Sequence, residues 1–195
     1  MRDPTNGNAA RAIGAQVIQL DVTNQQSVNT ALAGLPALDV LINNAGILGD
    51  AFGVDDLDAD AMATVLDTNV VGIVRVTQAA LPLLRRSANP VIVNVASGVG
   101  WPRSLQDPVH DEYPVQAVPY AASKAAVVAL TVQYAKNLPN MRVNASDPGY
   151  TATDFNHHSE QQTITEGTDA NVALATINQD GPTGEFHDRS ARIEY

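Results

Sequence analysis

The sequence contains no cysteine, which excludes disulfides and thiolate metal sites and fits a reducing compartment. Basic residues are also scarce, since 11 Lys and Arg stand against 21 Asp and Glu, for a formal net charge of −10. A chain this acidic is a poor partner for a nucleic-acid backbone or an anionic membrane surface. No apolar run reaches membrane-spanning length, and no apolar signal region opens the chain. We therefore expect a soluble, cytoplasmic protein with neither nucleic acid nor membrane as its partner.

Apolar residues gather in short runs separated by segments of helical length. Continuous apolar runs are typical of strands buried on both faces of a parallel sheet. Their alternation with helices predicts an α/β fold with a doubly wound parallel sheet of the Rossmann type, in one domain over 1–195. The predicted strands cover 16–20, 38–43, 90–95, 142–146 and 185–186, and the predicted helices cover 9–15, 24–33, 58–86, 120–138 and 167–175.

Three of the predicted helices carry signals of their own. Thr23 and Gln26 have the spacing of a capping box, which predicts a helix start. Gly72 and Pro82 are expected to interrupt the longest helical pattern. The helix over 120–138 is apolar on nearly every side, and such a helix is normally buried all round. We therefore expect it to pack against a second subunit as well as the sheet, in a homodimer or homotetramer.

Polar residues and glycines follow the predicted strands where these end. They are Asp21, the segment 44–46, Ser97 and the pair Pro148 and Gly149. The carboxyl ends of parallel strands share one edge of the sheet, and ligands of such sheets bind in the crevice outside that edge. The pattern therefore predicts a ligand site at this edge.

The stretch from Val91 to Lys124 has the parts of a proton-transfer device. An apolar run ends near Ser97, and a helix begins near Tyr120 and carries Lys124 one turn later. Positions i and i+4 lie on one helix face, so the phenol and the ammonium can share a pocket. The alternative is a pair on a helix surface, because Tyr-x-x-x-Lys is easily met by chance.

Six motifs cover nearly the whole chain: LDVT at 20–23, NNAG at 43–46, NVVG at 69–72, Ser97 after IVNVA, YAASK at 120–124 and DPGYTAT at 147–153. In this order and spacing they resemble the short-chain dehydrogenase/reductase family, and the long connection before YAASK is most similar to its carbonyl-reductase-like branch. The resemblance implies an NAD(P)-dependent oxidoreductase that transfers hydride between a nicotinamide cofactor and a carbonyl or secondary alcohol substrate.

The resemblance also implies catalytic roles for Asn69, Ser97, Tyr120 and Lys124. Tyr120 would exchange a proton with the substrate oxygen, because Lys124 and an oxidised nicotinamide would lower the pKa of its phenol from about 10. Ser97 would hydrogen-bond the same oxygen and fix its orientation. Asn69 would hold a water molecule that links Lys124 to solvent. The alternatives are a strand-end cap for Ser97 and a local hydrogen bond for Asn69.

The adenosine half of the cofactor would lie near the first two strand ends. Asp21 would accept a hydrogen bond from the adenine amino group, with the Val22 amide beside it. The alternative for Asp21 is a purely local role beside the helix cap at Thr23. The small residues that would let the backbone approach the ribose are Asn44, Ala45 and Gly46.

The nicotinamide half would lie near the later motifs. Tyr120 and Lys124 are expected to contact it, and Arg2 stands where NADP-preferring relatives place a basic residue. NADP is therefore the expected cofactor, with NAD as the alternative, and no metal site is expected. The residues implied for the nicotinamide amide and the phosphates are Pro148, Gly149, Thr151 and Thr153.

The sequence contains none of the family's opening strand, glycine-rich TGxxxGxG turn, helix and second strand. That turn binds pyrophosphate through backbone N–H groups and a helix dipole. Its absence predicts an N-terminally truncated three-layer sandwich with two apolar strand edges left unpaired. We hypothesise that the strands over 16–20 and 38–43 pair directly, or that the chain folds poorly.

Two other functions are alternatives to the oxidoreductase function. A shortened, catalytically silent relative could act as an interaction subunit. An epimerase or dehydratase of nucleotide-sugars could use the same Tyr/Lys pair, but NNAG and the short C-terminus argue against it. Trp101 and Tyr113 either line a substrate pocket or pack the long loop. His157 and His158 are interpreted as solvated residues, too few for a metal site.

Overall fold

A computed structural model describes residues 7–153 and 162–194, so Arg2, His157 and His158 lie outside the described residues. The strands are β1 (Val40–Asn43), β2 (Val91–Val95), β3 (Arg142–Ser146), β4 (Phe186–His187) and β5 (Arg192–Ile193). They form one sheet in the order β1-β2-β3-β4-β5. The first four strands are parallel, and β5 runs antiparallel to β4.

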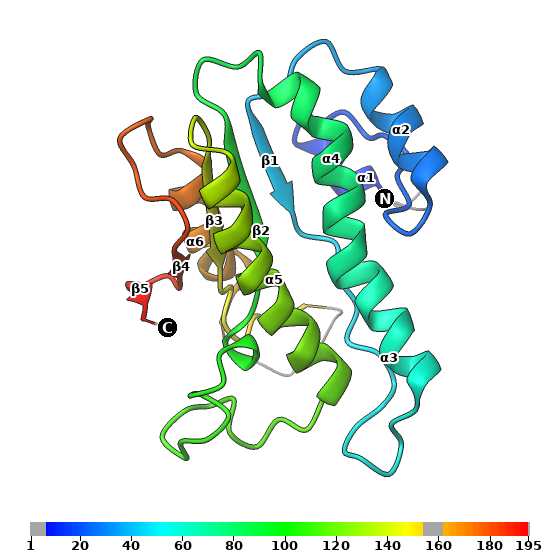
Figure 1. The fold of residues 1–195 in the computed structure, drawn as a ribbon, viewed down its shortest axis with the longest axis vertical. Coiled ribbons are helices and arrows are strands. Elements are labelled where there is room, and N and C mark those ends of the chain that lie inside the picture. Colours follow the sequence, from blue (N-terminus) through cyan, green and yellow to red (C-terminus); the bar gives the residue numbers. More distant parts are fainter. Residues whose placement is uncertain (1–6, 154–161, 195) are drawn as a thin grey trace.

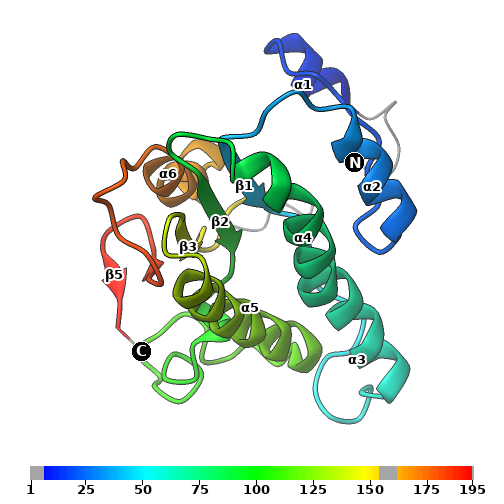
Figure 2. The ribbon, with the colours of Figure 1, turned by 45° about the horizontal axis from the view of Figure 1, so that its top comes forward.

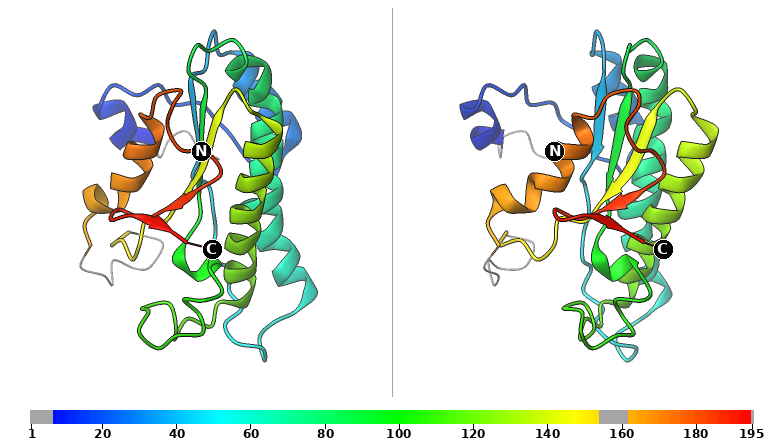
Figure 3. Two further views of the ribbon diagram at one scale, coloured as in Figure 1. Left: turned by 60° about the vertical axis from the view of Figure 1, so that its left-hand side comes forward. Right: turned by 90° about the vertical axis from the view of Figure 1, so that its left-hand side faces the viewer.

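The α-helices are α1 (Asn8–Ala12), α2 (Gln25–Ala33), α3 (Ala59–Leu66), α4 (Gly72–Leu84), α5 (Val118–Asn137) and α6 (Ile164–Ala175). They cover both faces of the sheet, as Figure 3 shows with the sheet nearly edge-on. α4 and α5 lie on one face, α2 packs outside α4, and α6 lies on the opposite face (Figure 1). This arrangement confirms the predicted doubly wound α/β fold.

The central strand β2 explains why its sequence is apolar without alternation. All of its residues are buried, and successive side chains of a strand point to opposite faces. Ile92 joins the main core cluster beneath α4 and α5, whereas Val91 and Val93 pack against Leu174 of α6. The buried members of the main cluster are Val28, Leu41, Val76, Ala80, Leu81, Leu84, Ile92, Met141 and Val143.

A chain of buried polar side chains fixes the helices against the sheet. Asn43 of β1 donates from Nδ2 to Asn94 Oδ1 at 2.8 Å and to Thr77 Oγ1 of α4 at 3.1 Å. Asn94 of β2 donates in turn to Thr131 Oγ1 of α5 at 2.9 Å. Each of these buried amides and hydroxyls would otherwise lack a hydrogen-bond partner. The hydrogen bonds therefore favour one register of α4 and α5 on the sheet.

The predicted first strand is not formed. Residues 16–20 form no strand, and β1 has one sheet neighbour, β2, within the described part of the chain. The hypothesis of direct pairing is therefore wrong. Leu20 and Val22 instead pack against the main core cluster, which holds this segment against the helices. Figure 2 shows α1 and α2 beyond the β1 edge of the sheet, and Figure 3 shows them on opposite sides of it.

Two helix boundaries also differ from the prediction. The cap of α2 is Asn24, whose side chain accepts from the Ser27 N–H at 2.9 Å, rather than Thr23. α3 and α4 are joined by one π-helical turn, η2 (Asp67–Val71), and Pro82 lies inside α4. The helical run therefore continues through Gly72 instead of breaking there.

α5 is less completely covered than its apolar sequence predicts. Its fully buried residues lie along the side that faces the sheet and the turn after β2, and most of its remaining apolar residues are half-buried. The second subunit expected on this helix stays a prediction. In the described part of the chain, no helix combines the length and hydropathy needed to cross a bilayer.

Candidate active site

A cleft of about 620 Å³ lies at the carboxyl ends of the parallel strands. The segments that follow β1, β2 and β3 frame it, together with the start of α5 and part of α6. A cleft is therefore present where the strand ends predicted a ligand site. Nine of the predicted site residues line it: Asn44, Gly46, Ser97, Tyr120, Lys124, Pro148, Gly149, Thr151 and Thr153.

Ser97 lies two residues after the end of β2 and precedes the 3-10 turn η3 (Gly98–Gly100). Gly100 lets this turn approach α5 closely, since a β-carbon there would lie 2.6 Å from the carbonyl carbon of Lys124. The side chains of Ser97 and Tyr120 are hydrogen-bonded to each other. The hydroxyl and the phenol that were predicted to share one oxygen atom therefore lie within reach of a common ligand atom.

Lys124 lies one helical turn after Tyr120 and is only 5% exposed. Its Nζ donates to the carbonyl oxygen of Val95 at 2.7 Å and lies 5.4 Å from the centre of the Tyr120 ring. Burial lowers the pKa of Lys124 to about 8, and the Asp147 carboxylate opposes that shift. The amine is therefore still mostly protonated at neutral pH, so the cleft holds a buried positive charge beside the phenol.

Burial raises the pKa of the Tyr120 phenol above its ordinary value. The hydrogen bond from Ser97 opposes this rise, whereas the charges of Asp147 and Tyr150 add to it. The protein's own groups therefore give a net rise in the pKa of Tyr120, instead of the lowering that was expected from Lys124 together with an oxidised nicotinamide. They hold the phenol protonated at neutral pH, which is the form that can donate a proton to a carbonyl oxygen.

Asn69 lies on the π-helical turn η2 behind the cleft and is 1% exposed. Its Oδ1 accepts from the Ile47 N–H at 2.8 Å, and its Nδ2 donates to the Ile47 carbonyl at 2.9 Å and to Ser123 Oγ at 3.0 Å. A β-carbon on Gly46 would lie 3.4 Å from Asn69 Oδ1 and 3.8 Å from Lys124 Nζ. Asn69 thus ties η2 to the loop after β1 and to α5.

The segment after β3 presents ordered backbone to the cleft. Asp147 Oδ1 accepts from the N–H of Gly149 at 2.9 Å, and Gly149 has a φ of +68°, a conformation that favours glycine. Gln162 donates from Nε2 to Thr151 Oγ1 at 2.9 Å and to the Pro148 carbonyl. These bonds hold the turn that was predicted to meet the nicotinamide.

Asp21, Val22 and Ala45 do not line this cleft. Asp21 Oδ1 accepts from the N–H of Thr23 at 3.0 Å and from its hydroxyl at 2.7 Å. Val22 packs against the main core cluster, and Ala45 is exposed at the end of β1. Their roles in binding adenosine stay predictions.

The cleft also contains residues that the sequence analysis did not assign to the site, among them Glu112 and Asp147. Burial raises the pKa of Asp147 to about 6, with help from Glu112 and Asp188, while the N–H groups of Gly149 and Gly98 oppose the rise. Asp147 directly follows the predicted fourth strand, so the strand-end rule could have found it. Glu112 lies in an irregular loop with no pattern to mark it.

Trp101 packs the long loop after β2. Its ring makes an edge-to-face contact with His110 at 5.4 Å, and the Arg103 guanidinium lies 5.8 Å from its centre. It also packs against the buried cluster that contains Val127. Trp101 does not line the cleft and so packs the loop, whereas Tyr113 is half exposed, and its role stays a prediction.

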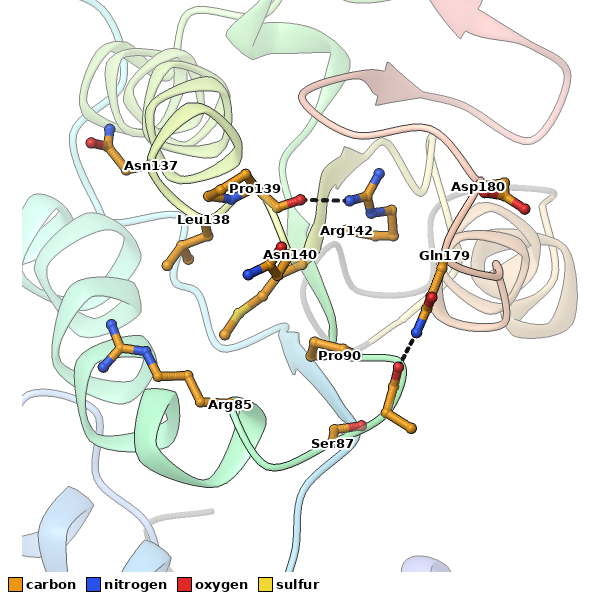
Figure 4. Close-up of a pocket in the computed structure, with 12 residues that line it drawn as sticks. Arg85, Ser87, Pro90, Asn137, Leu138, Pro139, Asn140, Arg142, Gln179 and Asp180 are labelled. Carbon is orange, nitrogen blue, oxygen red and sulfur yellow. Dashed lines mark hydrogen bonds between the residues drawn. The ribbon is translucent and has the colours of Figure 1, made fainter.

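A second cleft, also of about 620 Å³, opens at the opposite ends of the strands (Figure 4). Arg142 donates to the Pro139 carbonyl at 2.8 Å beside it, and Gln179 donates to the Ala88 carbonyl. None of the predicted site residues lines this cleft. The candidate active site is therefore the cleft at the carboxyl ends.

Residues 5–164 match the short chain dehydrogenase family. Over an alignment of 239 residues the chain is 29% identical to (+)-neomenthol dehydrogenase of Capsicum annuum, covering 86% of this chain and 76% of that protein. It is 28% identical to salutaridine reductase of Papaver bracteatum, covering 88% and 77%. The structure of NADPH bound carbonyl reductase from chicken fatty liver matches with a TM-score of 0.84 at 26% identity, over 99% of this chain and 84% of that one. The chain therefore belongs to the short-chain dehydrogenase family of oxidoreductases.

Proposed function

We propose that this chain is an NAD(P)-dependent oxidoreductase that interconverts a carbonyl compound and the corresponding secondary alcohol, or an aldehyde and its alcohol. The observation that carries the proposal is the hydrogen bond between the Ser97 and Tyr120 side chains, in a cleft that also holds the ammonium of Lys124. These three groups can surround one substrate oxygen, which is what a proton transfer coupled to hydride transfer requires.

In the reducing direction, Tyr120 Oη donates its proton to the carbonyl oxygen of the substrate. The Ser97 hydroxyl donates a hydrogen bond to the same oxygen and keeps it in line with the phenol. Lys124, 5.4 Å from the Tyr120 ring centre, stabilises the phenolate that the transfer leaves behind. A nicotinamide, when bound, supplies the hydride for reduction or accepts it in oxidation. In the oxidising direction the phenolate takes the proton back.

The residues of the cleft fit the nicotinamide end of such a cofactor. The turn at Pro148 and Gly149 presents ordered backbone groups, and the hydroxyls of Thr151 and Thr153 lie on the same wall. The segment after β1 adds Asn44 and Gly46 to the lining. Their arrangement offers hydrogen-bond partners to a carboxamide and room for a flat ring.

The fit to the rest of the dinucleotide is less complete. The sequence contains no glycine-rich turn of the TGxxxGxG type for the pyrophosphate. We propose NADP as the cofactor, with NAD as the alternative. This choice rests on Arg2, which lies outside the described residues, and on the NADPH bound by the chicken carbonyl reductase.

Asn69 is proposed to support the proton-transfer set from behind. Its three hydrogen bonds hold the loop after β1, η2 and α5 in one arrangement around Gly46 and Lys124. A water molecule near Gly46 could then receive a proton from Lys124 and pass it towards solvent. The role of Asn69 in this proposal is to keep that corner of the site polar and fixed.

The test is the consumption of reduced cofactor by the purified chain with a panel of ketones and aldehydes. NADPH, NADH and reduced nicotinamide mononucleotide are compared, because the mononucleotide carries only the half that the cleft fits best. We expect carbonyl-dependent oxidation with at least one of the three, and its loss in Tyr120→Phe. No turnover with any of them, by a folded chain, would overturn the proposal.

A further inference from the structure

One buried carboxylate joins the two loops that carry Ser97 and Gly149. Asp147 is 8% exposed and follows β3 directly. Its Oδ1 accepts from the Gly149 N–H at 2.9 Å, and its carboxylate also accepts from the backbone N–H of Gly98. A single side chain thus bridges the end of β2 and the end of β3 across the floor of the cleft.

The packing around Gly98 shows how tightly this bridge is built. A β-carbon on Gly98 would lie 2.9 Å from Asp147 Oδ2 and 2.2 Å from Glu112 Oε1. Because only glycine leaves that space, the carboxylate can reach the backbone of the residue next to Ser97. The backbone of Asp147 is held as well, since its own N–H donates to the His187 carbonyl at 2.7 Å.

We propose that Asp147 is a positioning residue whose carboxylate clamps the Ser97–Gly98 loop to the Pro148–Gly149 turn, and so sets the position of the serine hydroxyl relative to the nicotinamide site. This inference rests on the proposed function. A peptide N–H bonded to a carboxylate is held more strongly than one bonded to a neutral acceptor, so the clamp is strongest when Asp147 is ionised.

The charges that face Asp147 decide when it is ionised. Glu112 of the long loop and Asp188 after β4 both favour the protonated acid, as burial does. Lys124 and Tyr120 of α5 also interact with its charge, and the ammonium favours the carboxylate. Burial is the largest cause, and with Glu112 and Asp188 it raises the pKa of Asp147 to about 6, so the clamp weakens below that pH.

The direct test is an NMR titration of the uncomplexed protein that follows the backbone amide resonances of Gly98 and Gly149. Both N–H groups share one carboxylate, so both resonances should shift with one common midpoint near pH 6. In Asp147→Asn, which cannot ionise, both titrations should vanish. Two separate midpoints, or titrations that persist in this variant, would overturn the clamp.

Glu112→Gln is the matched control for charge. Glu112 lies over the same glycine, but within the described residues its carboxylate accepts no hydrogen bond from the Gly98 or the Gly149 N–H. Removing its charge should lower the common midpoint, because its charge raises the pKa of Asp147, and should keep the two amides titrating together. A shift of one amide midpoint without the other would count against a shared carboxylate.

Turnover provides the second readout. Asp147→Asn keeps one of the two hydrogen bonds and Asp147→Ala keeps neither, so kcat should fall in that order, by about 10-fold or more for alanine. Adding Asp147→Asn to Ser97→Ala should slow the reaction by less than it slows the wild type, because both act through the serine. Fully multiplicative effects would overturn the proposal.

The amide titration and the turnover measurement distinguish a failure of the clamp from a failure of the proposed function. If the wild-type chain turns over no carbonyl compound, the oxidoreductase proposal fails, while the amide titration still shows whether the clamp exists. If the chain is active and the amides titrate independently, the clamp alone is wrong. Should Asp147→Ala not fold, Asp147→Asn and Glu112→Gln carry both measurements.

Discussion

Asn69 and the peptide groups of Ile47 form a closed pair of hydrogen bonds, with the Ile47 N–H donating to Oδ1 at 2.8 Å and Nδ2 donating to the Ile47 carbonyl at 2.9 Å. An amide side chain can serve both groups at once, since its donor and its acceptor are bonded to the same carbon. The π-helical turn η2 aims this side chain at the loop after β1. The NVVG motif therefore has a structural role as well as its proposed catalytic one.

Asn69→Leu should destabilise the fold by about 2–4 kcal/mol, because it leaves the half-buried N–H and carbonyl of Ile47 and the buried Ser123 hydroxyl without this partner. Urea unfolding followed by circular dichroism measures this change. Asn29→Leu, at an exposed position of α2, is the matched control and should stay within about 0.5 kcal/mol of wild type. Equal stability of the Asn69 variant and wild type would contradict this account of η2.

Ser97→Ala should raise the pKa of Tyr120 further, because the hydrogen bond from Ser97 is the interaction that lowers it. In the oxidising direction the reaction needs the phenolate, so the rate at a fixed neutral pH should fall by about 10²-fold or more. The pH profile of alcohol oxidation should move to higher pH. A profile that moves to lower pH would contradict the assigned hydrogen bond.

Asp147→Asn should change how stability depends on pH. The pKa of Asp147 is raised in the folded state to about 6 from 3.8, so the folded state binds its proton more tightly than the unfolded chain does. Its contribution to stability is therefore present below about pH 4 and is lost as the pH rises through 6. Asparagine has no such loss, so the stability of the variant relative to wild type should rise over this window, by up to about 3 kcal/mol.

Thermal unfolding of both proteins from pH 4 to pH 8 tests this sign. Groups that do not interact with Asp147 titrate equally in both chains and cancel in the difference. A relative stability of Asp147→Asn that falls between pH 4 and 7 would mean that the folded protein lowers this pKa instead.

Asn94→Leu should destabilise the protein by about 2–4 kcal/mol. The change leaves Thr131 Oγ1 without its donor and Asn43 Nδ2 without one of its acceptors, both in the buried interior. Calorimetry should show a lower Tm, and Thr30→Val on the exposed side of α2 provides the comparison. A Tm equal to wild type would show that the polar chain through the sheet does not hold α4 and α5.

The sequence predicted the elements whose burial is complete along their length. Val91–Val95 is apolar on both faces because helices cover both, and its boundaries follow directly. Residues 16–20 are also rich in apolar side chains but form no strand, since a strand also needs a paired neighbour and β1 provides none. A π-helical turn leaves no periodic signal strong enough to distinguish it from a helix break at Gly72.

The residues of the candidate site also differ in whether a local sequence pattern predicts them. Ser97, Tyr120 and Lys124 come together because a strand end and one helix turn fix them, and both features are local in the sequence. Glu112 reaches Gly98 only through the irregular path of the loop after β2. Its place depends on packing among residues distant in sequence, which no local pattern encodes.

The central claim is that the Tyr120 phenol gives the proton to the substrate. The most direct measurement is the single-turnover rate of carbonyl reduction in Tyr120→Phe, with NADPH binding followed by fluorescence in parallel. Tyr134→Phe, whose hydroxyl meets only the exposed Gln78 among the described residues, is the matched control. We predict a rate at least about 10²-fold slower in Tyr120→Phe, with cofactor affinity retained, and a near wild-type rate in Tyr134→Phe. A Tyr120→Phe protein that binds NADPH and reduces the carbonyl at the wild-type rate would contradict the account.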